Sequence, residues 1–200
     1  MKINCINNYN PNFKAKFIKN TTILKKDNNG EYKNTKVSIA EIDFKNYRDI
    51  RSLRNITNNW SNEYEKKYTY GMDYSTIIQN YVEMEKGYRE NHCNGTVNNQ
   101  FFIMTNQNSD FDNLRPQNAL ALAQIRTIDD SFVKLEYLQV NPKYKFEPNK
   151  ERQIKHIGTN FLHDLTEIIP KPVELFSNNV AKPFYIKTGY KEDSFNKFTL

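Results

Sequence analysis

Leu135-Glu-Tyr-Leu-Gln-Val-Asn-Pro142 and Gln153-Ile-Lys-His-Ile-Gly158-Thr159 are the two most informative segments of this 200-residue chain. The first segment has the length and apolar content of a β-strand, which Pro142 ends because proline has no N–H for the sheet ladder. Apolar residues in and after the second segment recur at helical spacing: Ile154, Ile157, Phe161, Leu165 and Ile168. Pro170 then stops the helix. Together the segments predict a strand, a loop and a helix in direct succession.

The rest of the chain alternates between strand and helix patterns. Phe13, Ala15 and Phe17 alternate with lysines, and Asn28-Asn29-Gly30 is a strong hairpin turn signal. Further strands are predicted over 37–42, 100–105, 119–128, 132–140, 173–177 and 194–200. Helices are predicted from 47 to about 60, from 73 to about 88 and over 181–187, the last followed by Gly189. This order predicts a mixed α/β (α+β) domain on a mostly antiparallel sheet, with about four helices.

The composition is that of a folded, soluble protein. The chain has 13 Phe and 13 Tyr, which is too much aromatic surface for a disordered segment despite a mean hydropathy of −0.84. No apolar run approaches the ~20 residues that span a bilayer, and the first ten residues lack the apolar centre of a secretory signal. Cys5 and Cys93 are too few for a disulfide framework. We therefore expect a reduced, cytoplasmic protein with no membrane partner.

The net charge of +6 arises from 29 basic and 23 acidic residues. The chain contains 29 Asn and 22 Lys but only 7 Arg, which is typical of an AT-rich genome, and the lysines are interleaved with acidic residues. Nucleic-acid binding requires basic residues that gather on one face. The composition therefore argues against a nucleic-acid partner.

Several common catalytic and metal-binding motifs are missing from the sequence. It has no Gly-x-Gly-x-x-Gly and no Walker loop among its six glycines. His156 and His163 are seven residues apart, so they do not form a metal pair on one helical turn. Asp129 and Asp130 lie in a tight turn, where aspartates are common for structural reasons. We expect no metal cofactor.

The start of the helix near Gly158 is a candidate anion site. Backbone N–H groups in the first turn of a helix have no partner within the helix and carry the positive end of its dipole. They form a suitable site for a pyrophosphate. The alternative is an ordinary loop in which Gly158 eases the entry of the chain into the helix, and the residues of this segment alone do not decide between the two.

A third segment, Asn178-x-x-Ala181-x-x-Phe184-Tyr185-Ile-Lys-Thr-Gly189-Tyr190, follows the next predicted strand. With this segment in place, the chain resembles the GNAT superfamily of acetyl-coenzyme A-dependent N-acetyltransferases from about Val37 to Leu200. Leu135–Pro142 looks like the fourth strand of that family, Gln153–Gly158 like its pyrophosphate loop, and the third segment like its closing motif. We accordingly divide the chain into a strand and hairpin extension over 1–35 and a GNAT-like domain over 36–200.

The resemblance implies a fold in which the strands 135–140 and 173–177 are parallel neighbours that splay apart, with coenzyme A between them. The pantetheine arm would pair with the backbone of Leu138 and Val140, and Asn178 would fix this arm or the local turn. The pyrophosphate would lie on the backbone of the loop and helix start: Gln153, Ile154, Lys155, His156, Ile157, Gly158 and Thr159.

The resemblance also implies the catalytic groups. Tyr185 matches the residue that protonates or hydrogen-bonds the departing thiolate in the family, and the alternative is a tyrosine of the core. Glu136 and Glu174 are candidates for a general base that acts through a water. Glu136 is preferred because its strand borders the acetyl group.

The sequence departs from the family pattern in two places. His156 stands where the first glycine of the pyrophosphate loop is usual, and its side chain is a potential obstacle to the phosphate. The chain has only eleven residues after Gly189, where the family usually has two strands and this chain has room for about one. The amino-terminal hairpin is a candidate to cover that sheet edge instead.

We therefore predict an N-acetyltransferase that moves an acetyl group from acetyl-coenzyme A to a primary amine of a small molecule or protein. The alternative is a GNAT-fold binding module that has lost catalysis. A monomer and a homodimer both remain open. Aromatic residues near the first two helices would line an acceptor pocket or fill the core: Trp60, Tyr64, Tyr68, Tyr70 and Tyr74.

Overall fold

The computed structural model describes residues 15–43, 46–67, 99–144, 151–193 and 196–200. In chain order, the strands and α-helices are β1 (Lys16–Lys26), β2 (Tyr32–Ile42), α1 (Tyr47–Lys67), β3 (Asn99–Thr105), β4 (Ala119–Thr127), β5 (Val133–Val140), β6 (Ile154–Lys155), α3 (Ile157–Ile168), β7 (Val173–Phe176), α4 (Lys182–Lys187), β8 (Lys191–Glu192) and β9 (Lys197–Thr199). The helix predicted from 73 to about 88 lies outside the described residues.

The described strands form one sheet in the order β6-β1-β2-β3-β4-β5-β7-β9-β8. All neighbours are antiparallel except β5 and β7, which are parallel. The predicted fold class is therefore confirmed. The described part of the chain contains three α-helices beside this sheet, where the sequence predicted about four over its full length.

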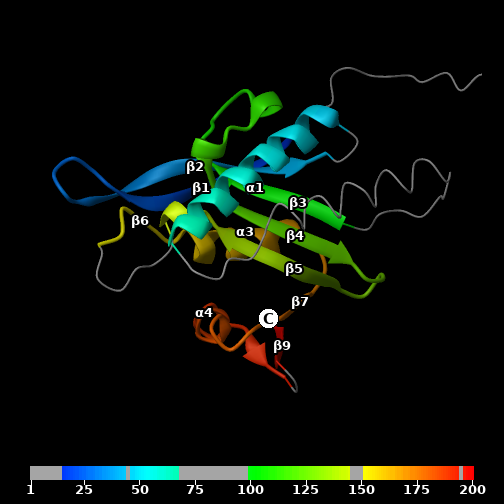
Figure 1. Ribbon diagram of the computed structural model, residues 1–200. Helices are drawn as coiled ribbons and strands as arrows, with labels where there is room; N and C mark the ends of the chain where they lie inside the picture. The colour runs from blue at the N-terminus through cyan, green and yellow to red at the C-terminus, as the bar shows by residue number, and fades with distance from the viewer. Residues whose placement is uncertain (1–14, 44–45, 68–98, 145–150, 194–195) are drawn as a thin grey trace, which may run out of the picture.

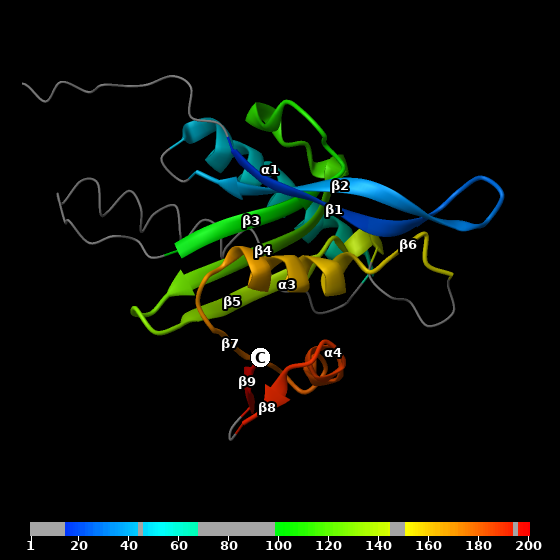
Figure 2. The ribbon, with the colours of Figure 1, turned by 180° about the vertical axis from the view of Figure 1, so that it is seen from behind.

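The helices α1 and α3 lie on opposite faces of the sheet (Figures 1 and 2). Leu53, Ile56 and Trp60 of α1 are buried in the core on one face. Phe161 and Leu165 of α3 are buried on the other, together with residues of α4 and the carboxyl-terminal strands. Within the described residues, no helix is long and apolar enough to cross a membrane.

The parallel strands β5 and β7 meet at one end only. Val133, Lys134 and Leu135 pair with Val173, Glu174 and Leu175. Beyond Leu135, β5 continues to Val140, and β7 does not accompany it. The helix α3 connects the two strands, as a parallel pair requires. The predicted splayed pair is confirmed, and its opening lies at the end of β5 that leads toward α3.

The amino-terminal strands β1 and β2 form the predicted hairpin, and Gly30 at its turn has a φ of 84° that suits glycine. This hairpin lies on the β3 side of the sheet, whereas β7, β9 and β8 extend the other side. The hypothesis that the hairpin covers the sheet edge near the carboxyl terminus is therefore wrong.

The chain after Gly189 forms two short strands, and not the single one that its length suggested. Lys191–Glu192 pairs with Lys197–Thr199, which in turn pairs with β7. Each strand is so short that both fit into the few residues available. They supply the neighbour that β7 needs on its outer side.

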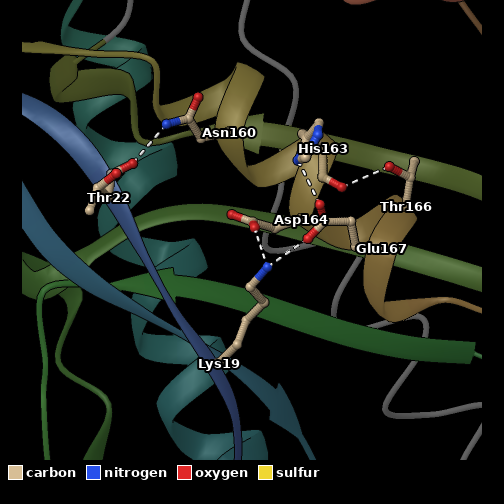
Figure 3. A network of polar contacts seen from close by, with 7 residues as sticks. All are labelled: Lys19, Thr22, Asn160, His163, Asp164, Thr166 and Glu167. Atoms are coloured by element: carbon tan, nitrogen blue, oxygen red, sulfur yellow. Dashed lines mark hydrogen bonds and ion pairs between the residues drawn. The ribbon is translucent and has the colours of Figure 1, made fainter.

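An ion-pair network joins β1 to α3 (Figure 3). The Lys19 ammonium lies 2.6 Å from Asp164 Oδ1 and 2.8 Å from Glu167 Oε2, and Asp164 is almost fully buried. The possible ligand atoms of His163, Asp164 and Glu167 lie within 4.8 Å of one another. A cation already lies against both carboxylates, because the Lys19 ammonium contacts each of them.

We expect Lys19→Met to lower the free energy of unfolding by about 1–3 kcal/mol, because it leaves the buried Asp164 carboxylate without its counter-ion. Lys33→Met is the matched control, since Lys33 pairs with Asp27 on the surface and such pairs contribute about 0–1 kcal/mol. Urea unfolding of both variants measures the difference. Equal effects of the two substitutions would contradict a special role for the Lys19 network.

Candidate functional site

The first part of the candidate site is the edge of β5 beyond Leu135, which pairs with no described strand on the β7 side. In the pairing with β4, Leu135 lies opposite Ile125 and Tyr137 lies opposite Gln124, so that Glu136 is one extra residue in β5. Such a bulge bends a strand and increases its twist. It occurs where β5 parts from β7. Leu138 and Val140, predicted to hold the pantetheine arm, lie on the diverging part and pack against the α3 side of the core.

The end of β5 is fixed by Asn141. Its side-chain amide donates a hydrogen bond to the carbonyl of Ala119 at 2.8 Å, and its backbone N–H donates to the carbonyl of Leu120 at 2.8 Å. Its Oδ1 accepts from the N–H of Lys143 at 3.0 Å, which starts the turn after the strand. The side chain and the backbone of the buried Asn141 therefore hold the end of β5 in place through hydrogen bonds.

The second part is the loop 151–156 and the start of α3. Gln153 is exposed, and Ile154 and Lys155 form β6, which pairs with β1. Ile154 thus lies in a strand although its spacing also fits the helix, which begins at Ile157. None of the described side chains caps this helix start. The early N–H groups of α3 precede any acceptor within the helix and are available to an anion.

His156 occupies the position immediately before α3 in a left-handed conformation, with φ 65° and ψ 13°. Residues other than glycine adopt this conformation at a cost, and histidine does so more often than most. The backbone therefore has the shape that a glycine would allow, with an exposed imidazole added to it. The geometry explains how histidine is accommodated where the family pattern has glycine.

Gly158 brings the start of α3 close to β5 and α4. A Cβ atom at this position would lie 3.3 Å from Cγ2 of Val140 and 3.5 Å from the ring of Phe184. The first of these distances is tighter than normal packing, so the absence of a side chain allows the close approach. The predicted loop, strand and closing motif are thus brought together around one residue.

Tyr185 of α4 is part of an aromatic cluster that also includes residues after this helix. Its ring centroid is 5.0 Å from that of Phe184 and 6.0 Å from those of Tyr190 and Phe198. Burial raises the pKa of the Tyr185 hydroxyl to about 12. The hydroxyl is therefore protonated at neutral pH, as a hydrogen-bond donor or a proton donor must be.

Tyr190 is the last residue of the closing motif, and the sequence pattern predicts no role for it. Its hydroxyl is buried and makes no hydrogen bond with any described residue. Burial, and to a smaller extent Tyr185, raises the pKa of Tyr190 above its usual value. The two tyrosines form an apolar environment in which a phenolate is strongly disfavoured.

We expect the protein to lose stability between pH 10 and 12, because the folded state binds the Tyr185 proton more tightly than the unfolded chain. The stabilisation is complete below the unfolded pKa of 10 and is lost as the pH rises through about 12. Two pKa units correspond to about 3 kcal/mol. Thermal unfolding over this range should show a smaller decline for Tyr185→Phe than for the wild type. Equal declines would mean that the hydroxyl is not protected by burial.

The two candidate bases are both ion-paired. Glu136 lies 2.6 Å from Arg126 Nη2 and 3.0 Å from Lys134 Nζ, and Glu174 lies 2.8 Å from Lys197 Nζ. Glu136 stands at the bulge, whereas Glu174 lies in the paired part of β7. Glu136 is thus the candidate nearer to the point at which the strands part.

Two other predicted residues have clear structural surroundings. The Asn178 side chain accepts from the N–H of Ala181 at 2.9 Å and so holds the turn before α4, which was one of the two roles considered for it. Trp60 is 1% exposed and belongs to the core. For this residue the structure agrees with the alternative prediction, in which the aromatic side chains fill the core and do not line an acceptor pocket. Tyr68, Tyr70 and Tyr74 lie outside the described residues.

No local pattern in the sequence indicates which residues hold the loop 151–156. Tyr32 donates a hydrogen bond to the carbonyl of Arg152, 120 positions away in the chain. The Lys155 ammonium lies 3.7 Å from the centroid of the Tyr32 ring. Contacts between such distant segments depend on the register of β1 with β6, which no local pattern predicts.

No protein-family model matches the sequence, and no curated protein matches it. Similar solved structures include Tetrahymena GCN5, at 12% identity and a TM-score of 0.47 over 80% of this chain and 91% of that chain. An acetyltransferase from Streptococcus agalactiae is 15% identical, with a TM-score of 0.45 over 82% and 95% of the two chains. A GNAT-family acetyltransferase from Staphylococcus aureus is 17% identical, with a TM-score of 0.42 over 82% and 96%. These similarities are too distant to assign the chain to the superfamily or to transfer an activity, and the resemblance stays a prediction from the sequence motifs.

Proposed function

We propose that this protein is an acetyltransferase that takes an acetyl group from acetyl-coenzyme A and transfers it to a primary amine of a small molecule or protein. The observation that carries the proposal is the course of β5. This strand parts from β7 after Leu135, and its last residue, Val140, lies beside the start of α3, which no described side chain caps. An open strand edge beside a set of free helix N–H groups suits a ligand with an amide-containing arm and a pyrophosphate.

The coenzyme would lie in this opening with its pantetheine amides against the backbone of Leu138 and Val140. Its pyrophosphate would accept hydrogen bonds from those N–H groups of the loop and helix start, Gln153 to Thr159, that are not used in the pairing of β6 with β1. The close approach at Gly158 supports this placement, because it sets the helix start directly beside Val140. The proposed ligand thus connects both parts of the site.

The reaction needs three groups from the chain. The amine nitrogen attacks the thioester carbon, the C–N bond forms and the C–S bond breaks, so that a thiolate leaves and the amine loses a proton. A backbone N–H near the end of β5 would stabilise the oxyanion. Tyr185 would donate a hydrogen bond or a proton to the thiolate. Its raised pKa keeps the hydroxyl protonated, which supports donation of a hydrogen bond more than transfer of the proton.

Glu136 is the base that we propose for the amine proton, with Glu174 as the second candidate. The position of Glu136 at the bulge supports this choice. Its carboxylate is shared between Arg126 and Lys134, so it would act through a water that takes the place of one cation. The cytoplasmic location and the monomeric or homodimeric state stay predictions from the sequence.

Thermal unfolding with acetyl-coenzyme A tests the proposed function. A ligand that binds only the folded state at 100 times its Kd adds about 2.7 kcal/mol of stability, and we expect a clear rise in Tm. A screen of primary amines as acceptors then measures whether the protein transfers the acetyl group to any of them. Binding without transfer to any amine would favour the catalytically degenerate module. No rise in Tm at millimolar ligand would contradict coenzyme binding.

We expect His156→Gly to bind coenzyme A about two- to tenfold more tightly, because it removes an exposed side chain next to the proposed pyrophosphate site. The change in stability should be small. Relief of the left-handed conformation, worth about 1–2 kcal/mol, is opposed by the greater freedom of glycine in the unfolded chain. Calorimetric titration measures the Kd. If the variant binds no better than the wild type, the imidazole does not obstruct the ligand.

A further inference from the structure

We propose that Tyr32 is a positioning residue for coenzyme binding, which acts by holding the loop 151–156 from the β1–β2 hairpin. This inference rests on the proposed function, because it concerns the same pyrophosphate site. Tyr32 is half-buried and stands at the start of β2. Its hydroxyl donates to the Arg152 carbonyl, and its ring contacts Lys155. It therefore contacts the loop at two places, three residues apart.

The hairpin holds the loop at further points. The backbone N–H of Lys26 donates to the Gln153 carbonyl at 2.9 Å, and the Lys26 ammonium pairs with Glu151. Leu24 and Lys25 pair with β6. Beyond the loop, the side chain of Asn160 on α3 donates to the Thr22 carbonyl at 2.7 Å, as Figure 3 shows. The loop and the first turns of α3 are thus attached to one strand, β1, and to Tyr32.

These contacts determine the direction of the peptide groups in the loop. In a trans peptide, the carbonyl of one residue and the N–H of the next point to opposite sides. The carbonyls of Arg152 and Gln153 are turned toward the hairpin by Tyr32 and Lys26. The N–H groups of Gln153 and Ile154 belong to the same two peptide groups and therefore point away from the hairpin atoms that bind the carbonyls. In this orientation they would join the N–H groups at the start of α3 in binding the pyrophosphate. The Tyr32 hydroxyl orients one of these peptide groups directly.

The ring of Tyr32 also affects the charge near the site. The Lys155 ammonium lies 3.7 Å from the ring centroid, a favourable cation–π distance. This contact keeps a cation beside the loop whose N–H groups we assign to the pyrophosphate. Loss of the ring would release the Lys155 side chain, and loss of the hydroxyl alone would release the Arg152 peptide. The two contributions can therefore be separated by substitution.

Two variants and a matched control test the proposal. Tyr32→Phe removes only the hydroxyl, Tyr32→Leu also removes the ring, and Tyr47→Phe removes a hydroxyl from an exposed residue at the start of α1. The probes are coenzyme A and pantetheine, which lacks the pyrophosphate. Calorimetric titration gives the Kd of each probe, and thermal unfolding establishes that each variant is folded.

We expect Tyr32→Phe to weaken coenzyme A about two- to tenfold, the range for one hydrogen bond that fixes the binding conformation. Tyr32→Leu should weaken it by about tenfold or more, because the contact with Lys155 is lost as well. The affinity for pantetheine should change less than twofold in both variants, and Tyr47→Phe should behave as the wild type.

Unchanged affinity for coenzyme A in both Tyr32 variants would overturn the proposal. An equal loss for coenzyme A and pantetheine would overturn it too, because it would mean that Tyr32 supports the fold in general. If Tyr32→Phe is unstable, the ratio of the Kd for coenzyme A to the Kd for pantetheine still tests the proposal. A general loss of structure would raise both Kd values and leave their ratio unchanged. A wild-type protein that binds no coenzyme A overturns the proposed function itself, which is a distinguishable result.

Discussion

Tyr185→Phe should lower kcat by about 10²–10⁴-fold, which is ~3–5 kcal/mol of activation free energy. The substitution keeps the ring and its packing against Phe184, Tyr190 and Phe198. It removes only the hydroxyl that we assign to the departing thiolate. Because this interaction is made mainly in the transition state, the affinity for coenzyme A should change little.

The measurement is steady-state turnover with an amine found by the acceptor screen, or slow hydrolysis of acetyl-coenzyme A in its place. Tyr190→Phe is the matched control, since it removes a neighbouring buried hydroxyl that forms no hydrogen bond with described residues. Full turnover by Tyr185→Phe would return this residue to a packing role. A variant that unfolds would show that the hydroxyl is a structural donor.

Gly158→Leu should lower the affinity for coenzyme A by about 10²–10⁴-fold, because the new side chain separates the start of α3 from β5. A Cβ at this position already lies 3.3 Å from Val140, and a longer side chain has to displace the helix or the strand. Displacement would cost at least two hydrogen bonds to a charged phosphate, each worth about 1.5–3 kcal/mol. The overpacking itself should lower stability by about 1–3 kcal/mol.

A graded series separates these effects. Gly158→Ala requires Val140 to move by only a few tenths of an ångström, so its loss of affinity should be small. Adding Val140→Ala to this variant removes the contacting methyl and should restore part of that loss. Calorimetric titration of coenzyme A gives the Kd values. Wild-type affinity in Gly158→Leu would contradict the placement of the ligand at this helix start.

Local patterns were sufficient to predict most of the sheet. Asn28-Asn29-Gly30 predicted the hairpin because only a few residue types suit that turn, and Pro170 predicted the end of the helix because its ring excludes further helical hydrogen bonds. The segment Leu135–Pro142 is a strand whose end is fixed by Asn141. For the hairpin turn and the helix end, the determining interaction lies within a few residues of the signal, whereas Asn141 binds Ala119, 22 positions away in the chain.

The features that failed or were missed depend on pairing between distant segments. Ile154 fits the helical spacing, yet its pairing with Lys25 of β1 places it in β6. The register of β5 against β4 determines the bulge at Glu136. The contact of Tyr32 with Arg152 depends on how the β1–β2 hairpin packs against the loop 151–156. The two short terminal strands exist because β7 offers an edge to them. Such registers are decided by tertiary packing, which propensity does not report.

Amide hydrogen exchange with and without coenzyme A tests the proposed binding site most directly. The N–H groups at the start of α3 and along the edge of β5 that have no partner among the described residues should become hydrogen-bonded when the ligand binds. We predict slower exchange over 153–159 and 136–140, with little change in α1. Binding of coenzyme A with protection confined to other segments, or with none at all, would contradict the site.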